Sequence, residues 1–257
     1  MWVRAGVPLP NLLVIGAMKC GTSALHTHLD RHPEIAMAPG KELNFFFGSE
    51  AKPPPPESEW WRHGQWHRGL EWYQSQFDPT ARLRGESSPG YTDPRHPQAA
   101  SRIRSVAPQA RLVYSVREPL SRALSQWRHH RRDGTEPRPA EEALLDPDSD
   151  YVARSRYLER LRPFLDVFDA EQVLVVVQER LRRDPRPTFR RIFEHVGADP
   201  AFWDAALSDE VHVGAAEAEA DQAATDRLRS AFLSEVDDDV AGLCKLFGDL
   251  LPEWSHR

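Results

Sequence analysis

Residues 12–23 read Leu-Leu-Val-Ile-Gly-Ala-Met-Lys-Cys-Gly-Thr-Ser, an apolar run followed by a glycine-containing turn and two hydroxyl residues. The run Leu12–Ile15 is typical of a short strand that is buried on both faces of a parallel sheet. Thr22 to Arg31 follows, with Leu25 and Leu29 one turn apart, and this spacing indicates a helix. A strand that passes through a tight turn into a helix predicts an α/β fold.

Further segments repeat this pattern along the chain. Short apolar runs predict strands at Arg111–Val116 and Val173–Val177, and a weaker candidate, Leu83–Glu86, precedes a Ser-Ser-Pro-Gly turn. Helices are expected over Pro94–Val106, Pro119–Arg132, Tyr151–Phe168, Pro187–Val196 and Thr225–Phe247. Strands that alternate with helices predict a central parallel β-sheet, flanked by helices and joined by right-handed crossovers.

The chain is expected to form a single domain over residues 1–257, with its core at about 11–200 and a helical C-terminal segment at about 222–254. An irregular insertion is expected at about 48–69, because four consecutive prolines are followed by Trp60, Trp61 and Trp66. These tryptophans are candidate platforms for an acceptor molecule. Gly214–Asp221, rich in alanine and acidic residues, is expected to be a surface loop.

The composition restricts the class of protein. The 257 residues carry a net charge of −6, which does not favour nucleic acid or an anionic membrane as a partner. The two cysteines have no disulfide or zinc spacing, and no apolar run is long enough to span a bilayer. We therefore expect a cytoplasmic protein, and its richness in arginine, alanine and proline favours a bacterial source.

The strongest chemical signal is the turn from Gly16 to Ser23. Backbone N–H groups of the turn and of the first helical turn converge on one point, where the helix dipole adds about +0.5 charge. Lys19 adds a full positive charge, and Thr22 and Ser23 add hydroxyl donors, so the segment predicts an anion site. In the nucleoside triphosphatase P-loop the lysine follows the second glycine, whereas here Lys19 precedes Gly21. A P-loop kinase or nucleoside triphosphatase is therefore only the alternative.

A second signal follows the next strong strand, in Arg117-Glu118-Pro119-Leu120-Ser121-Arg122-Ala123-Leu124-Ser125. An arginine at the carboxyl end of a strand lies beside the ligand crevice of an open α/β sheet. Pro119 then starts a helix, and Ser125 lies about two turns into it. A guanidinium and a serine hydroxyl together suit a phosphate monoester.

These two motifs resemble those of sulfotransferases that use 3′-phosphoadenosine 5′-phosphosulfate (PAPS), most closely the carbohydrate branch with the heparan sulfate enzymes and their bacterial relatives. The resemblance implies a P-loop-like fold and transfer of a sulfuryl group from PAPS to a hydroxyl, or less readily an amine, of a saccharide or small-molecule acceptor. The product would be adenosine 3′,5′-bisphosphate, and no metal is implied. The resemblance implies that the 3′-phosphate binds to Arg117 and Ser125. It also implies that the 5′-phosphosulfate binds to Lys19, Cys20, Gly21, Thr22, Ser23 and Ala24.

The resemblance extends to Lys41-Glu42-Leu43-Asn44-Phe45-Phe46, where Glu42 falls on the position of the catalytic base. A carboxylate there would remove the proton of the attacking hydroxyl, while Lys19 stabilises the leaving phosphate. Asn44, Ser87 and Tyr91 are the residues expected to contact the acceptor. Matches to other motifs of the family occur at Gly69–Tyr73, Gly85–Tyr91 and Arg180–Pro185.

Three positions depart from the family pattern. Ser87 stands where the family often has lysine, Asn44 stands where the heparan-type enzymes often have histidine, and His212-Val213-Gly214 leads into acidic rather than basic sequence. A non-catalytic nucleotide-binding protein therefore stays open as a third reading. His28 and His32 are spaced like metal ligands, but no carboxylate completes a site, so we expect a mixed surface and packing role for them. The identity of the acceptor and the oligomeric state are not encoded in any motif.

Overall fold

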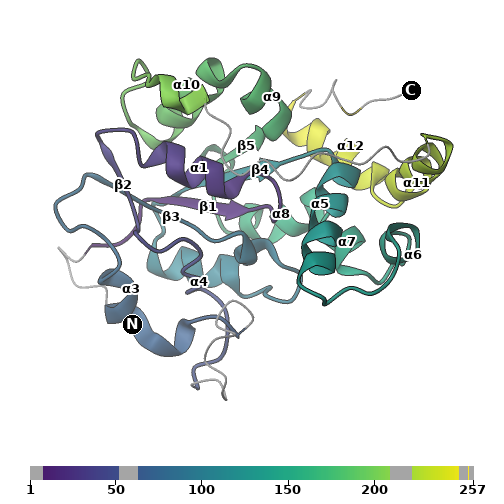
Figure 1. Ribbon diagram of the computed structural model, residues 1–257. Coiled ribbons are helices and arrows are strands. Elements are labelled where there is room, and N and C mark those ends of the chain that lie inside the picture. Colours follow the sequence, from purple (N-terminus) through teal and green to yellow (C-terminus); the bar gives the residue numbers. More distant parts are fainter. Residues whose placement is uncertain (1–7, 52–62, 209–221, 249–253, 255–257) are drawn as a thin grey trace.

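The computed structural model describes residues 8–51, 63–208, 222–248 and 254 (Figure 1). The described chain forms one sheet of five parallel strands in the order β2-β3-β1-β4-β5. The strands are β1 (Leu12–Gly16), β2 (Ile35–Met37), β3 (Leu83–Ser87), β4 (Arg111–Val116) and β5 (Val173–Val177). This is the single-domain α/β fold that the sequence predicted.

Both faces of the sheet are covered by helices because side chains of β1 alternate between two cores. Leu13 and Ile15 belong to one core, and Leu12 and Val14 to the other. The first core packs against α4 (Ala99–Val106), α8 (Tyr157–Leu165) and α12 (Asp237–Phe247), and the second against α1 (Thr22–Leu29), α9 (Gln178–Arg183) and α10 (Pro185–Val196) (Figure 1).

A third group of helices lies beside the sheet, toward the right of Figure 1. It has its own apolar core, to which Leu120, Leu144 and Phe232 contribute. Its members are α5 (Pro119–Arg132), α6 (Ala140–Leu144), α7 (Asp150–Ala153) and α11 (Gln222–Ser234). The remaining described helices are α3 (Gly69–Gln74) and four short 3₁₀ turns, η2 (Trp66–Arg68), η3 (Pro89–Thr92), η4 (Ala170–Gln172) and η5 (Ala205–Ser208).

The strand order determines where a ligand crevice opens. The chain leaves β1 toward β2 on one side of the sheet, and it leaves β4 toward β5 on the other side. In open parallel sheets, the crevice forms where two neighbouring strands send their connections in opposite directions. The crevice therefore lies between the carboxyl ends of β1 and β4, where the Gly16–Ser23 turn and the segment from Arg117 to Pro119 leave the sheet.

The four predicted strands and the helix α5 are confirmed by the structure. The strand β2 was not anticipated, because three residues are too few to give a periodic signal. The expected helix over Tyr151–Phe168 is interrupted. The Asp239 carboxylate of α12 accepts hydrogen bonds from the N–H groups of Leu158 and Glu159, both at 2.8 Å, and so caps a new helix start. This long-range cap cannot be seen in a local pattern.

Two other expected helices also differ from the prediction. The segment Thr225–Phe247 contains two helices, α11 and α12, and three consecutive acidic residues from Asp237 onward occupy the first turn of the second one. Helix α4 begins at Ala99 rather than at Pro94, because the Asp93 carboxylate folds residues 93–95 into a turn by accepting the Arg95 N–H at 3.0 Å.

Part of the expected insertion, with Trp60 and Trp61, and the loop Gly214–Asp221 lie outside the described residues. Trp66 packs against Phe45, with ring centroids 5.0 Å apart, and the Arg102 guanidinium lies 4.4 Å from its ring centroid. His32 packs between Phe193 and Phe202, in agreement with the packing role expected for it. Among the described helices, none has the length and apolar character needed to cross a membrane.

Candidate active site

The turn after β1 is held in one conformation by its neighbours. Gly16 is required because a β-carbon there would collide with the Thr92 hydroxyl. Lys19 and Gly21 have φ angles of 68° and 78°, and these two left-handed residues bend the chain into α1. Ser115 of β4 fixes the turn at both ends, because its carbonyl accepts the Ala17 N–H and its hydroxyl donates to the Cys20 carbonyl, each at 2.7 Å.

The start of α1 presents free donors. Its first intrahelical bond runs from the Leu25 N–H to the Gly21 carbonyl at 3.0 Å, so the N–H groups of Thr22, Ser23 and Ala24 have no acceptor within the helix. The hydroxyls of Thr22 and Ser23 donate to no other described residue. Cys20 was expected to bind the 5′-phosphosulfate together with these residues. Its N–H, however, already donates to the Ala17 carbonyl at 3.2 Å. Burial raises the pKa of the Cys20 thiol to about 11, which makes it a poor nucleophile.

Lys19 lies half-buried at the mouth of this turn. Burial lowers the pKa of its ammonium group, and the nearby positive charge of Arg132 lowers it further, whereas Asp133 and Glu42 raise it. Within the described part of the chain its Nζ makes no hydrogen bond or ion pair. The ammonium group is therefore a partly desolvated cation close to Glu42.

Arg117 and Ser125 extend the site along the next strand and helix. Arg117 follows β4, and Ser125 lies in the second turn of α5. No described residue pairs with the Arg117 guanidinium or with the Ser125 hydroxyl. The second arginine of the motif has another role, because Arg122 is fully buried and donates to Ser155 Oγ at 2.8 Å and to the Tyr151 carbonyl at 2.6 Å. Arg122 is thus an internal clamp of the α5 region.

One tyrosine connects the two strand ends. The Tyr157 hydroxyl donates to the Arg117 carbonyl at 2.6 Å and lies 3.7 Å from the Cys20 sulfur. The charge of Arg117 also acts on the pKa of Cys20, which it lowers against the larger effect of burial. The Lys19 turn and the Arg117 segment are therefore adjacent, and the sequence motifs that specify them meet at one crevice.

Glu42 is carried by a segment with an unusual backbone. Glu42 and Asn44 have φ angles of 62° and 48°, a left-handed conformation that costs non-glycine residues on the order of 1–3 kcal/mol each. The segment is held by hydrogen bonds that the N–H groups of Glu42, Asn44 and Phe45 donate to the last residue of β3 and to two residues after it. A typical hydrogen bond contributes about 1 kcal/mol, so these bonds together are comparable with the strain. The Glu42 side chain is about one-third exposed and pairs with Lys41.

The three residues expected to contact the acceptor are buried instead. Asn44, Ser87 and Tyr91 are 2%, 0% and 1% exposed. The Ser87 hydroxyl lies 3.1 Å from His26 Nδ1, and the Tyr91 hydroxyl bonds to Glu86 within the core. The Tyr91 hydroxyl also accepts the Phe45 N–H at 3.2 Å, so of the three side chains only that of Tyr91 supports the segment that carries Glu42.

Sequence reasoning missed several residues at the site. The charges of Lys19 and Glu42 both act on the pKa of His129, which is lowered mainly by burial. The charge of Arg132 also acts on Lys19, and this places the last turns of α5 beside Lys19. A usable signal was present, because Ser125, His129 and Arg132 are spaced i, i+4 and i+7 and so share one helix face. Gln178, the first residue of α9, covers Gly21, where a β-carbon would come within 2.6 Å of its side-chain nitrogen.

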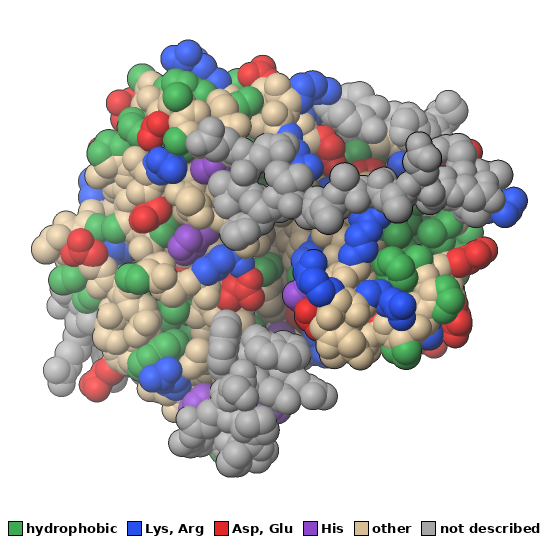
Figure 2. All heavy atoms as spheres, viewed as in Figure 1, with side chains coloured by type: hydrophobic (Ala, Val, Ile, Leu, Met, Phe, Trp, Pro, Cys, Tyr) green, Lys and Arg blue, Asp and Glu red, His purple; other side chains and the backbone are tan. Residues whose placement is uncertain are grey.

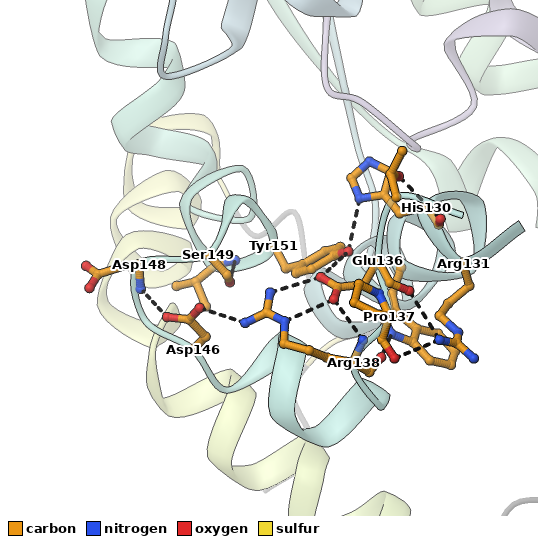
Figure 3. A network of polar contacts seen from close by, with 12 residues as sticks. His130, Arg131, Glu136, Pro137, Arg138, Asp146, Asp148, Ser149 and Tyr151 are labelled. Carbon is orange, nitrogen blue, oxygen red and sulfur yellow. Dashed lines mark hydrogen bonds and ion pairs between the residues drawn. The ribbon is translucent and has the colours of Figure 1, made fainter. Parts of the chain in front are cut away.

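A polar network anchors the C-terminal end of α5, which carries His129 and Arg132 (Figure 3). Arg138 binds the Glu136 carboxylate with two hydrogen bonds of 2.9 Å and Asp146 with one of 3.0 Å. Tyr151 donates to Glu136 at 3.2 Å and lies 3.0 Å from His130 Nδ1. These bonds lower the pKa of Glu136 to about 2, with the Arg138 hydrogen bonds as the main cause.

The molecular surface is hollowed near the carboxyl ends of β1 and β4, where the crevice is expected (Figure 2). In the view of Figure 2, the molecule is hollowed between the sheet side and the α5 side, and Lys, Arg and His side chains gather at the rim together with acidic ones. Within the described ranges, no group of three or more His, Cys, Asp or Glu side chains is arranged to hold a metal ion. The site as described is a hydroxyl-rich crevice with several cations, and the carboxylates of Asp133 and Glu42 both act on Lys19.

Comparison with known proteins places this geometry in context. Residues 10–204 match the model of the sulfotransferase family. The chain is 30% identical over 199 residues to heparan sulfate glucosamine 3-O-sulfotransferase 3B1 of Mus musculus, which covers 74% of this chain and 46% of that protein. It is 28% identical over 193 residues to the bifunctional heparan sulfate N-deacetylase/N-sulfotransferase 1 of Caenorhabditis elegans, covering 69% of this chain and 21% of that protein. The chain thus spans about a fifth to a half of the length of these relatives.

Solved structures agree in fold over more of the chain. A sulfotransferase from Alicyclobacillus acidocaldarius superposes with a TM-score of 0.78 at 29% identity, covering 96% of this chain and 99% of that one. The sulfotransferase domain of the olefin synthase of Synechococcus PCC 7002 shares the fold at 17% identity, with a TM-score of 0.54, covering 91% of this chain and 95% of that domain.

Proposed function

The chain belongs to the sulfotransferase family, and on that premise we propose that it transfers a sulfuryl group from PAPS to a hydroxyl of a saccharide or small-molecule acceptor. The observation that carries the proposal is the set of donors at two adjacent strand ends that have no partner among the described residues. Lys19 with the α1 N-terminus lies on one side, and Arg117 with Ser125 on the other. A nucleotide with a phosphate at each end is the ligand whose charges match both.

Each end has donors of the appropriate kind. The N-terminus of α1 and Lys19 suit the doubly charged phosphosulfate, because helix N–H groups and an ammonium stabilise a phosphate without a metal. Arg117 suits the 3′-phosphate, because a planar guanidinium binds a phosphate with two parallel hydrogen bonds. Ser125 adds one hydroxyl donor. The 3′-phosphate contact would fix the position of the sulfuryl group relative to Lys19 and Glu42.

The proposed reaction is an in-line displacement at sulfur. The acceptor oxygen forms a bond to sulfur, while the bond from sulfur to the bridging phosphate oxygen breaks. The proton of the acceptor hydroxyl passes to Glu42. The negative charge that develops on the bridging oxygen is stabilised by Lys19 and the free N–H groups of α1, which are already in place before the reaction. Adenosine 3′,5′-bisphosphate then leaves.

The position of Glu42 supports its assignment as the base. Its side chain is partly exposed, so an acceptor can reach it, and its charge acts on the pKa of Lys19. Lys19 would hold the leaving group while Glu42 takes the proton, so the two residues would act on opposite sides of the transferred sulfur. The heparan sulfate relatives motivate saccharides as the first acceptors to try.

A single-turnover assay tests this proposal. The enzyme is mixed with donor labelled in its sulfuryl group and with a panel of hydroxyl acceptors that includes glucosamine-containing oligosaccharides. The expected result is a labelled acceptor and an equal amount of adenosine 3′,5′-bisphosphate. In a parallel binding assay, the bisphosphate should compete with the donor, whereas ATP with magnesium should not. Preferential binding of ATP with magnesium, followed by its hydrolysis, would contradict the proposal and favour a nucleoside triphosphatase.

A further inference from the structure

The buried carboxylate of Glu86 is not used by the proposed reaction, yet it lies directly beneath the segment that carries Glu42. Glu86 is the fourth residue of β3 and is fully buried. Three hydroxyl groups donate to it, namely Tyr73 at 2.9 Å, Ser88 at 2.6 Å, and Tyr91. Burial raises the pKa of Glu86, and the three hydroxyl donors oppose that shift.

Two of these hydroxyls also hold the segment of Glu42. Ser88 Oγ accepts the Asn44 N–H at 3.0 Å, and Tyr91 Oη accepts the Phe45 N–H at 3.2 Å. A hydroxyl has only one hydrogen. Because Ser88 and Tyr91 each direct that hydrogen to Glu86, their lone pairs face the segment. The carboxylate therefore sets the direction in which both hydroxyls can accept.

We propose that Glu86 is a positioning residue for the base Glu42, which it holds in its left-handed backbone conformation through the oriented hydroxyls of Ser88 and Tyr91. This inference rests on the proposed function, in which Glu42 takes the acceptor proton. The segment makes a third hydrogen bond to this region, because the Glu42 N–H donates to the carbonyl of Ser87, the last residue of β3, at 2.9 Å. Residues 87–91 thus accept three hydrogen bonds from this segment, and the Gln65 N–H adds one to the Asn44 carbonyl at 3.0 Å.

The protein offers a matched pair of variants. Tyr73→Phe and Tyr91→Phe each remove one hydroxyl donor from Glu86, by the same chemical change in a fully buried side chain. Only the Tyr91 hydroxyl also accepts a hydrogen bond from the segment of Glu42. A general loss of stability would affect both variants alike, whereas a loss of positioning would affect only Tyr91→Phe.

The expected results separate binding from turnover. Glu86→Gln should lower kcat on the order of 10–100-fold and Tyr91→Phe about tenfold, because small misplacements of a catalytic group cost rate. Tyr73→Phe should stay within about twofold of the wild type. The affinity for adenosine 3′,5′-bisphosphate should change less than about twofold in all three, since Glu86 does not contact the residues proposed to bind it. Equal kcat values for the two tyrosine variants would overturn the proposal.

Amide hydrogen exchange measured by NMR gives a readout that does not depend on catalysis. The N–H groups of Asn44 and Phe45 should exchange about tenfold faster in Tyr91→Phe and in Glu86→Gln than in the wild type, and unchanged in Tyr73→Phe. If no acceptor is sulfated by the wild type, the proposed function fails, but the exchange result still decides whether Glu86 orders this segment. Unchanged exchange in Tyr91→Phe would overturn the inference even in an active enzyme. If Glu86→Gln does not fold, the tyrosine pair is sufficient for the test.

Discussion

The donor side and the base side of the candidate site are built in different ways. On the donor side, Lys19, Arg117 and Ser125 project from two local motifs at strand ends, and no described residue occupies their polar groups. On the base side, the conformation of Glu42 depends on hydroxyls more than 40 residues further along the chain. The comparison teaches that a short sequence can identify a candidate anion site, although Ser115 also fixes its turn, whereas the conformation of Glu42 can be read only from the assembled fold.

The largest effect is expected on the base side. Glu42→Gln removes the group proposed to accept the proton, and general-base catalysis contributes about 10²–10⁴-fold to the rate. We expect kcat to fall by that order while the affinity for adenosine 3′,5′-bisphosphate stays the same. Stopped assays and calorimetry measure the two quantities. Turnover like that of the wild type would remove Glu42 from the mechanism.

The second largest effect on kcat is expected from a variant on the donor side. Lys19→Ala removes a charge that acts on both the bound donor and the leaving phosphate, so kcat should fall on the order of 10²–10³-fold. Unlike Glu42→Gln, it should also weaken the binding of adenosine 3′,5′-bisphosphate. The same two assays apply, with circular dichroism as a control for the fold. A variant with lower kcat and unchanged affinity would place Lys19 on the base side instead.

The donor side of the candidate site could be predicted from the sequence more fully than the base side. The Gly16–Ser23 turn and the Arg117–Ser125 segment were readable because glycine, proline, lysine and arginine stand at fixed offsets next to apolar strands. Asn44, Ser87 and Tyr91 were expected to contact the acceptor, but a sequence position does not give the direction of a side chain, and all three are buried. The capping of α8 by Asp239 and the support of Glu42 by Tyr91 join distant segments, so neither leaves a local signal.

A pH experiment tests the surroundings of Lys19. Burial and the charge of Arg132 lower the pKa of its ammonium group, so donor binding should weaken as the pH rises through that lowered pKa and the cation loses its proton. Arg132→Gln removes the larger of the two positive charges that lower the pKa of Lys19, those of Arg132 and Lys41, so that pKa should rise. The alkaline fall in affinity for adenosine 3′,5′-bisphosphate should then move to higher pH. An unchanged midpoint in this variant would show that Arg132 does not act on Lys19.

The smallest effect concerns the network that anchors α5. Hydrogen bonds from Arg138 depress the pKa of Glu136 to about 2, below the value of about 4.3 for an unfolded glutamate. A depressed carboxyl pKa stabilises the fold above the unfolded value, and that stabilisation is lost as the pH falls from about 5 to about 2. Glu136→Gln should lower the Tm at pH 7 by roughly 2–4 °C.

Calorimetric scans at several pH values check this prediction. Between about pH 5 and pH 2 the Tm of the wild type should fall more steeply than that of Glu136→Gln, so the two curves approach each other. Parallel curves would mean that the Glu136 carboxylate keeps an ordinary pKa in the folded protein.

The most direct test of the account is the affinity of the crevice for three nucleotides, adenosine 3′,5′-bisphosphate, 5′-AMP and 3′-AMP, measured by calorimetry on the wild type and on Arg117→Ala. Hydrogen bonds to a charged group contribute about 1.5–3 kcal/mol, which corresponds to roughly 10–100-fold in Kd. We expect Arg117→Ala to weaken the bisphosphate and 3′-AMP by about that factor and to leave 5′-AMP unchanged. An equal loss for 5′-AMP, or no preference for the bisphosphate in the wild type, would contradict a site that holds one nucleotide at both of its phosphates.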